Sequence, residues 1–170
     1  MNIAQAIAPQ NIEPITREFL SFRLGSQEYG IDILKVQEIR VCERITPIAN
    51  TPETIKGVID LRGIIVPIVD LRVQFGLNTA HADGAAMVIV LNTADRVVGV
   101  VVDGVSEVVA LSPEQIKAPP EFNEAVETDY VLGLGNLNDR LLILVDIEHL
   151  ISSESIGLLN TTPSLKGNLS

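Results

Sequence analysis

The sequence predicts a mainly β protein, and three observations support that fold class. Short runs of Val, Ile and Leu alternate with turn-forming residues along much of the 170-residue chain. Some of these runs flank Gly- or Asn-containing pairs that favour hairpin turns. The runs also recur in the same order in the two halves of the chain, which indicates an internal duplication. The length fits one domain of ordinary size, or two small barrels fused into one unit.

The first strands are expected after a flexible N-terminal arm. Residues 1–14 are rich in Ala, Gln, Asn and Pro, a composition that gives a chain terminus little to pack with. Strands are expected at 18–24 and 28–33, since the second segment alternates polar with apolar residues. The short segment 25–27 between them forms a turn.

A hairpin is expected around Arg62-Gly63. The flanking runs 58–61 and 64–69 are dense in β-branched residues, and glycine supplies the unusual backbone angles of a tight turn. In the second run we expect Ile65 and Ile68 to be at least partly buried.

The same order of elements returns in the second half of the chain. Strands are expected at 87–91 and 97–102, followed later by a second hairpin. That hairpin joins 132–137 to 140–145 through Asn138-Asp139. Each half therefore reads as two strands, a bend, a hairpin and a short helix.

The duplication is supported in two registers. Gly30 aligns with Gly99, 69 positions later, and Gly57 aligns with Gly133, 76 positions later. The second register also aligns two aspartates that cap short helices, Asp70 and Asp146. The alternative is that aliphatic strands align with one another by chance.

Composition and charge narrow the class of partner. The chain carries 12 basic and 22 acidic residues, a net charge of −10. Small barrels often bind oligonucleotides, but that needs clustered cations and stacking aromatics, which are scarce here. No apolar run reaches the roughly 18–20 residues of a membrane span. We therefore expect neither nucleic-acid binding nor direct membrane insertion, and the single cysteine, Cys42, favours a cytosolic setting.

No catalytic motif is visible. His81 lies in a polar loop and His149 lies beside acidic residues, but neither cluster supplies enough ligands for a metal site. A hydrolase is the alternative, and the cluster at His149 is the only candidate catalytic group for it. The chain has no phosphate-cradling loop and no nucleophile elbow. We expect a protein that binds other proteins, is not an enzyme, and holds no metal or cofactor.

Two long strings of residues carry a family resemblance. They are Tyr-Gly-Ile-Asp-Ile-Leu-Lys-Val-Gln-Glu-Ile-Arg at 29–40 and Ile-Lys-Gly-Val-Ile-Asp-Leu-Arg-Gly at 55–63. Shorter strings continue the same order at 47–52, 67–72 and 97–108. Together they resemble the signatures of the CheW family, over roughly 18–159. One departure is Asp60, where the family usually has Asn before Leu-Arg-Gly, an isosteric change.

The resemblance implies a fold and an arrangement of the chain. The fold is two intertwined, SH3-like, five-stranded β-barrels with short helices. The CheW-like domain is expected at 15–159, with barrel one at about 18–80, barrel two at about 84–150 and a short C-terminal helix. Residues 160–170 are expected to form a flexible tail.

The resemblance also implies a role. Such a protein is a chemotaxis adaptor that couples chemoreceptors to the histidine kinase CheA. Its expected partners are the CheA regulatory domain and the cytoplasmic tip of the receptor, with self-association within arrays as a further expectation. It is expected in the cytoplasm, associated with membrane receptor arrays through its partners. The alternative is a scaffold of a related chemosensory pathway that serves pili or another non-flagellar system.

Carried over by motif, four residues resemble positions that the family uses for partner contact: Val36, Glu38, Gly57 and Arg62. Arg62 lies in a hairpin turn between apolar strands, where a guanidinium can make forked hydrogen bonds to a partner carboxylate or carbonyl. The alternative for Arg62 is a local bond to Asp60 or to a turn carbonyl.

The other candidates have alternatives of their own. Gly57 lets a partner backbone approach closely, or it marks a strand bulge. Val36 is a contact residue or part of the core, and Glu38 is a contact residue or an ordinary surface charge. Phe122 follows Pro119-Pro120 and precedes a polar stretch, so it is a further candidate as an exposed aromatic anchor.

Overall fold

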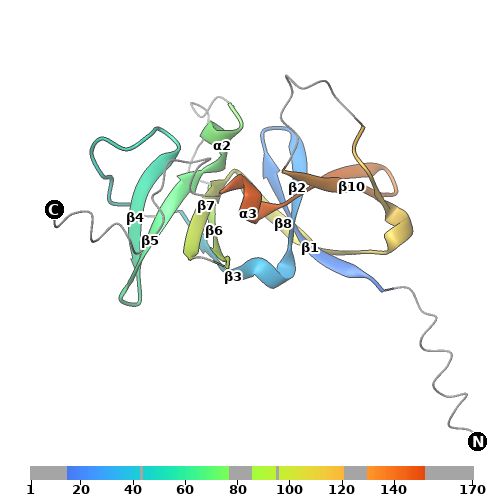
Figure 1. Ribbon diagram of the computed structural model, residues 1–170, viewed down its shortest axis with the longest axis horizontal. Coiled ribbons are helices and arrows are strands. Elements are labelled where there is room, and N and C mark those ends of the chain that lie inside the picture. Colours follow the sequence, from blue (N-terminus) through green and yellow to red (C-terminus); the bar gives the residue numbers. More distant parts are fainter. Residues whose placement is uncertain (1–14, 43, 77–85, 95, 121–129, 152–170) are drawn as a thin grey trace, which may run out of the picture.

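The computed structural model describes residues 15–42, 44–76, 86–94, 96–120 and 130–151. Strands dominate it and form two sheets, accompanied by two four-residue α-helices and two short 3-10 turns (Figure 1). The predicted mainly β fold class is therefore confirmed. The expected N-terminal arm and C-terminal tail lie outside the described residues.

Sheet A has six strands and contains the first and the last strand of the described chain. Neighbouring strands are antiparallel except for β2 and β11, which run parallel. Across the sheet the order is β8 (Gly104–Leu111), β1 (Arg17–Leu24), β2 (Gln27–Asp32), β11 (Arg140–Val145), β10 (Val131–Leu137) and β9 (Ile116–Lys117). The sixth strand, β9, is a two-residue addition to the five strands that the resemblance implied.

Sheet B has five strands and lies in the middle of the chain. It is also antiparallel except at one place, where β5 and β7 run parallel. Across the sheet the order is β3 (Val36–Val41), β6 (Met87–Asn92), β7 (Val97–Val102), β5 (Ile64–Asp70) and β4 (Ile55–Leu61).

The two halves of the chain are intertwined in these sheets. The first half of the chain contributes two strands (β1, β2) to sheet A and three (β3, β4, β5) to sheet B. The second half contributes two strands (β6, β7) to sheet B and four (β8, β9, β10, β11) to sheet A. The chain crosses between sheets at the 3-10 turn η1 (Ile33–Lys35) and again at Asp103. The sheets therefore do not coincide with the expected ranges 18–80 and 84–150, because the third strand of each half pairs with the first strand of the other half.

The strand register confirms the duplication. Gly30 lies opposite Leu144 in sheet A, and Gly99 lies opposite Ile68 in sheet B, so both parallel pairs obey the two alignment registers. An added Cβ at Gly30 would lie 2.9 Å from Leu144 Cδ2, and one at Gly99 would lie 2.6 Å from Ile68 Cδ1. In both halves, therefore, a larger residue here would force the aliphatic side chain opposite to shift.

The two α-helices follow the two hairpins and are capped as expected. The Asp70 carboxylate accepts a hydrogen bond from the Arg72 backbone N–H at the start of α2 (Leu71–Gln74). The Asp146 carboxylate accepts from the backbone N–H groups of Glu148 and His149 at the start of α3 (Ile147–Leu150). These bonds satisfy helix N–H groups that have no partner within the helix.

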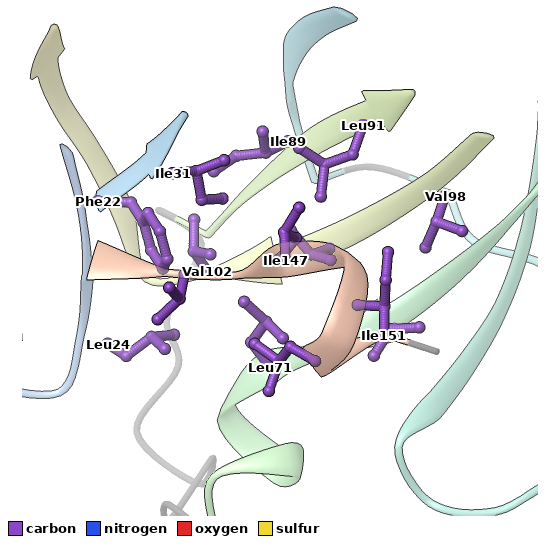
Figure 2. Close-up of a cluster of buried hydrophobic side chains, with 14 of the residues drawn as sticks. Phe22, Leu24, Ile31, Leu71, Ile89, Leu91, Val98, Val102, Ile147 and Ile151 are labelled. Carbon is purple, nitrogen blue, oxygen red and sulfur yellow. The ribbon is translucent and has the colours of Figure 1, made fainter. Parts of the chain in front are cut away.

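The main core is shared by both sheets and both helices. Figure 2 shows its side chains converging from strands of each sheet onto α2 and α3. The residues labelled there are Phe22, Leu24, Ile31, Leu71, Ile89, Leu91, Val98, Val102, Ile147 and Ile151. Because one apolar cluster joins the two sheets, burial of its side chains stabilises the two sheets together as one unit.

The expected burial of Ile65 is wrong. Ile68 is fully buried, whereas Ile65 is 61% exposed. Side chains of a strand alternate between faces, so two residues three positions apart lie on opposite faces. Ile65 therefore faces away from the core that Ile68 enters.

Candidate partner-binding surface

Two of the expected contact residues, Arg62 and Glu38, meet on sheet B. Arg62 occupies the β4–β5 turn, and its Nη2 donates to Glu38 Oε2 of β3 at 2.7 Å. The Arg62 side chain remains 66% exposed, against 26% for Glu38. Asp60, the expected local partner of Arg62, instead accepts a hydrogen bond from the Gly63 backbone N–H at 2.8 Å. The structure thus joins residues 24 positions apart into one exposed ion pair.

The charges around this pair favour its ionised form. The hydrogen bond from Arg62 holds the pKa of Glu38 below its usual value, and the nearby Arg40 guanidinium, 3.8 Å from Glu38 Oε1, acts in the same direction. Two guanidiniums therefore face one carboxylate on the β3 side of sheet B.

Arg62 has an uncommon backbone conformation. Its φ is 51° and that of Gly63 is 92°, so both central residues of the turn are left-handed. Asn, Asp and Gly are favoured at such positions, and other residues are strained there. The Arg62 side chain therefore lies at the tip of the hairpin and is largely exposed.

Gly57 lies beneath this surface rather than on it. It is buried, has φ 146° and marks a bulge in the β4–β5 ladder between Ile55 and Gly57. An added Cβ would lie 2.1 Å from the backbone oxygen of Thr46, whose segment exchanges two backbone hydrogen bonds of 2.9 Å with Val58. The close approach at Gly57 is therefore made by the chain's own backbone, as in the bulge alternative.

Val36 is half-buried at the beginning of β3. It is the C-cap of η1, where its N–H donates to the Ile33 carbonyl, and it packs against the main core. The core alternative thus describes part of its environment. The fifth candidate, Phe122, lies outside the described residues.

Exposed aliphatic side chains also lie on β3, which carries Glu38, and on β5, which follows the Arg62 turn. On β3 they are Ile39, 40% exposed, and Val41, 56% exposed. On β5 they are Ile64, 57% exposed, and Ile65, 61% exposed. Sequence reasoning missed these residues, since it placed aliphatic strand residues inside without deciding which face of sheet B was solvent-facing.

A shallow cleft of about 100 Å³ adjoins this surface. It lies between β3 and β4, and its lining combines two guanidiniums and one carboxylate with aliphatic side chains. The lining residues are Arg40, Val41, Arg44, Ile45, Ile59, Asp60 and Val88. We name the exposed aliphatic residues of β3 and β5, the Arg62–Glu38 pair and this cleft together the hairpin surface.

The described residues offer no other cluster with evident chemistry. Among them, no group of three or more His, Cys, Asp or Glu side chains is arranged to hold a metal ion. No helix in the described part of the chain is long and apolar enough to cross a membrane. The hairpin surface combines an exposed ion pair with exposed aliphatic side chains, a composition that suits binding of a complementary protein surface.

Comparison with known proteins agrees with this description. The family model described as CheW-like domain matches residues 18–155. The Chemotaxis protein CheW of Klebsiella aerogenes is 57% identical over 148 residues, covering 87% of this chain and 89% of the relative. The Chemotaxis protein CheW of Rhizobium meliloti is 34% identical over 138 residues, covering 81% and 89%. The crystal structure of the scaffolding protein TtCheW from Thermoanaerobacter tengcongensis has a TM-score of 0.77 and 29% identity, covering 86% of this chain and all of that one.

Proposed function

We propose that this chain couples chemoreceptors to the histidine kinase CheA by binding both. The chain belongs to the CheW-like family of chemotaxis adaptors, and the proposal starts from that membership. Its partners would be the regulatory domain of CheA and the cytoplasmic tip of the receptor. The protein would act in the cytoplasm, reach the membrane arrays through those partners, associate with further copies there, and need no cofactor and no catalysis of its own.

The observation that carries the proposal is the backbone conformation and the exposure of Arg62. It occupies a left-handed turn position that favours Asn, and at the equivalent turn of the duplicated half the residue is Asn138, with φ 52°. Residues with strained backbone conformations cluster at functional sites, where the side chain has a role in binding or catalysis. Here the side chain is a guanidinium that is 66% exposed and shares one hydrogen bond with Glu38.

The chemistry of the hairpin surface supports a protein partner. A guanidinium has five N–H donors, and Arg62 uses one of them on Glu38, so others remain for a carboxylate or carbonyl of a partner. The exposed Ile64 and Ile65 beside it would supply apolar contact. The two other candidates would act less directly, since Val36 anchors β3 and Gly57 shapes the surface from below.

A bridging protein must hold its two partners at the same time, through different surfaces. The duplication supplies two related sheets, and their turns differ, with Arg62-Gly63 on one and Asn138-Asp139 on the other. Related but unequal surfaces support the proposal of two different partners.

The test is a titration of this protein into fixed amounts of receptor and kinase, with phosphate transfer by the kinase as the readout. Receptor-controlled kinase activity should rise while ternary complexes form, then fall when receptor and kinase each bind separate adaptor copies. A plateau that persists far above saturation of both partners would contradict bridging. It would favour an activator that makes one contact at a time.

A further inference from the structure

The first crossover between the sheets is held by an ion pair. Lys35 ends η1, directly before β3, and its Nζ donates to Glu148 Oε2 on α3. Glu148 follows β11 of sheet A, and its carboxylate also accepts a hydrogen bond from the Ala94 backbone N–H in the β6–β7 turn of sheet B. One carboxylate thus links α3 to the crossover at η1 and to the β6–β7 turn. We call the Lys35–Glu148 pair the first clamp; Figure 1 shows α3 between the two sheets.

The second crossover is held at the equivalent place with the charges reversed. Arg72 of α2 donates from Nη1 to Asp103 Oδ1 at 3.3 Å, and Asp103 Oδ2 accepts from the Gly25 backbone N–H at 2.7 Å. Arg72 aligns with Glu148 in the register of 76 positions, since each is the second residue of its helix. In both halves, therefore, the second helix residue ties a crossover, as cation in one half and as anion in the other.

The two clamps differ in how firmly they are built. Arg72 is 5% exposed and is also held by Asp70, through Nε at 2.9 Å and Nη2 at 3.0 Å. The side chains of Lys35 and Glu148 are 38% and 33% exposed. Ion pairs with that exposure are weak and sensitive to salt. The first clamp is the one that can open while the shared core stays packed.

The position of the first clamp connects it to the hairpin surface. Lys35 is followed by Val36 and the rest of β3, which carries Glu38, the partner of Arg62. β3 is the outermost strand of sheet B in the pairing order, with β6 as its neighbour. An outermost strand loses the order of its first residues easily unless its entry is fixed.

We propose that Lys35 and Glu148 are positioning residues, which fix the start of β3 against α3 and thereby hold Val36 and Glu38 where a partner meets them. The pair itself does not touch the partner. Hydrogen bonding to Lys35 lowers the pKa of Glu148, and the same bond raises the pKa of Lys35, so both groups are charged at neutral pH. Asp32 and Asp146 also face Lys35 and favour its charged form.

The first experiment is a charge-swap cycle read by hydrogen exchange on the full chain without any partner. Lys35→Glu and Glu148→Lys should each speed exchange of the amides at 33–38 by about three- to fivefold, the size expected for an exposed ion pair replaced by like charges. The double swap should return the rates to within about twofold of the original. At about 1 M salt, where the Debye length is about 3 Å, the differences should shrink.

A matched control separates the clamp from net charge. Lys117→Glu makes the same change in net charge as Lys35→Glu, at an exposed position on β9 of sheet A, and it should leave exchange at 33–38 unchanged. Unchanged exchange in both single variants, or a double swap as fast as the faster single variant, would overturn the proposal.

The second experiment rests on the proposed function and uses the CheA regulatory domain and a receptor fragment as probes. Each single variant should weaken binding of the partner that contacts β3 by about threefold, and the double swap should restore it. If the unmodified chain binds neither probe, the proposed function fails, while the exchange result still decides the clamp. Weakened binding that the swap does not restore would mean that Lys35 or Glu148 contacts the partner, against the positioning role.

Discussion

The β4–β5 and β10–β11 hairpins descend from one repeat and now use their arginines differently. In β4–β5, Arg62 lies in the turn, donates to Glu38 of β3 and stays 66% exposed. In β10–β11 the turn residue is Asn138, and Arg140, two positions on, makes the ionic contacts.

The contacts of Arg140 are more numerous. It donates to both oxygens of Glu28, at 3.0 and 3.2 Å, and from Nη1 to Glu107 at 3.0 Å. Glu107 aligns with Glu38 in the duplication, so both halves pair the same glutamate with an arginine of the hairpin. The comparison teaches that Arg140 directs three N–H donors to carboxylates of sheet A, whereas Arg62 directs one to Glu38 and stays more exposed.

The largest contrast should come from the two bulge glycines. Gly57→Ala should cost about 2–4 kcal/mol of unfolding free energy, because φ is 146° and the new Cβ would meet the Thr46 backbone oxygen at 2.1 Å. Gly133→Ala should cost less, about 1–2 kcal/mol, because its nearest contacts are at 3.0 Å. Urea denaturation of both variants measures the difference, and equal losses would show that the bulges are equivalent.

The next contrast concerns binding and uses the two arginines. Arg62→Ala should leave the melting temperature nearly unchanged, because the pair with Glu38 is exposed, but weaken binding to the kinase regulatory domain or the receptor fragment by about tenfold. Arg140→Ala leaves Glu28 and Glu107 without their cation, so it should lower the melting temperature more.

The outcome for Arg62 decides between its two roles. If Arg62→Ala binds both partners as the original does and melts at a lower temperature, Arg62 is a structural turn residue. Calorimetry of binding, run beside thermal melting on the same samples, separates these outcomes.

A smaller contrast is expected between two exposed aliphatic residues. Ile65 and Leu141 are equivalent in the duplication and are 61% and 51% exposed. Replacing either with Ser should change stability by less than about 1 kcal/mol. Ile65→Ser should weaken partner binding by about fivefold because it lies beside the Arg62 turn. If only Leu141→Ser weakens binding of both partners, the hairpin surface has been placed on the wrong sheet.

The sequence predicted the repeat, the hairpins and the helix caps because these depend on local signals. The capping aspartates at 70 and 146 and the turn residues at 62 and 138 each act within a few positions of the chain. The exchange of strands between halves depends on long-range pairing, which leaves no local signal in the sequence. It was predicted only through the family resemblance.

The candidate surface was predicted in part for the same reason. Motifs indicated Glu38 and Arg62, but their ion pair joins different strands and could not be derived from spacing. Burial of Ile65 was predicted wrongly because its run, Ile-Ile-Val-Pro-Ile-Val, is apolar at every position, so no alternation marks the outward face. From the sequence, Glu148 is only a neighbour of His149 in a weak candidate metal cluster. No local pattern could predict its ion pair with Lys35, 113 positions away.

The smallest effect concerns pH and sharpens the contrast between the two arginines. Arg62 lowers the pKa of Glu38 from its ordinary value of 4.5. A carboxyl whose pKa is lowered in the folded state adds stability above its unfolded pKa and loses it as pH falls through the folded value. The pair is therefore intact at neutral pH and weakens only in acid.

Titration of the Glu38 carboxyl by NMR tests this directly. Its midpoint should lie below 4.5 in the unmodified chain and move upward in Arg62→Ala, while Arg140→Ala should not move it, because Arg140 pairs with other glutamates. Binding extends the test. If a partner carboxylate takes Arg62 away from Glu38, the midpoint of the Glu38 carboxyl should rise in the complex. A midpoint that stays low in the complex would mean that Arg62 keeps its bond to Glu38 and that the pair meets the partner as one unit.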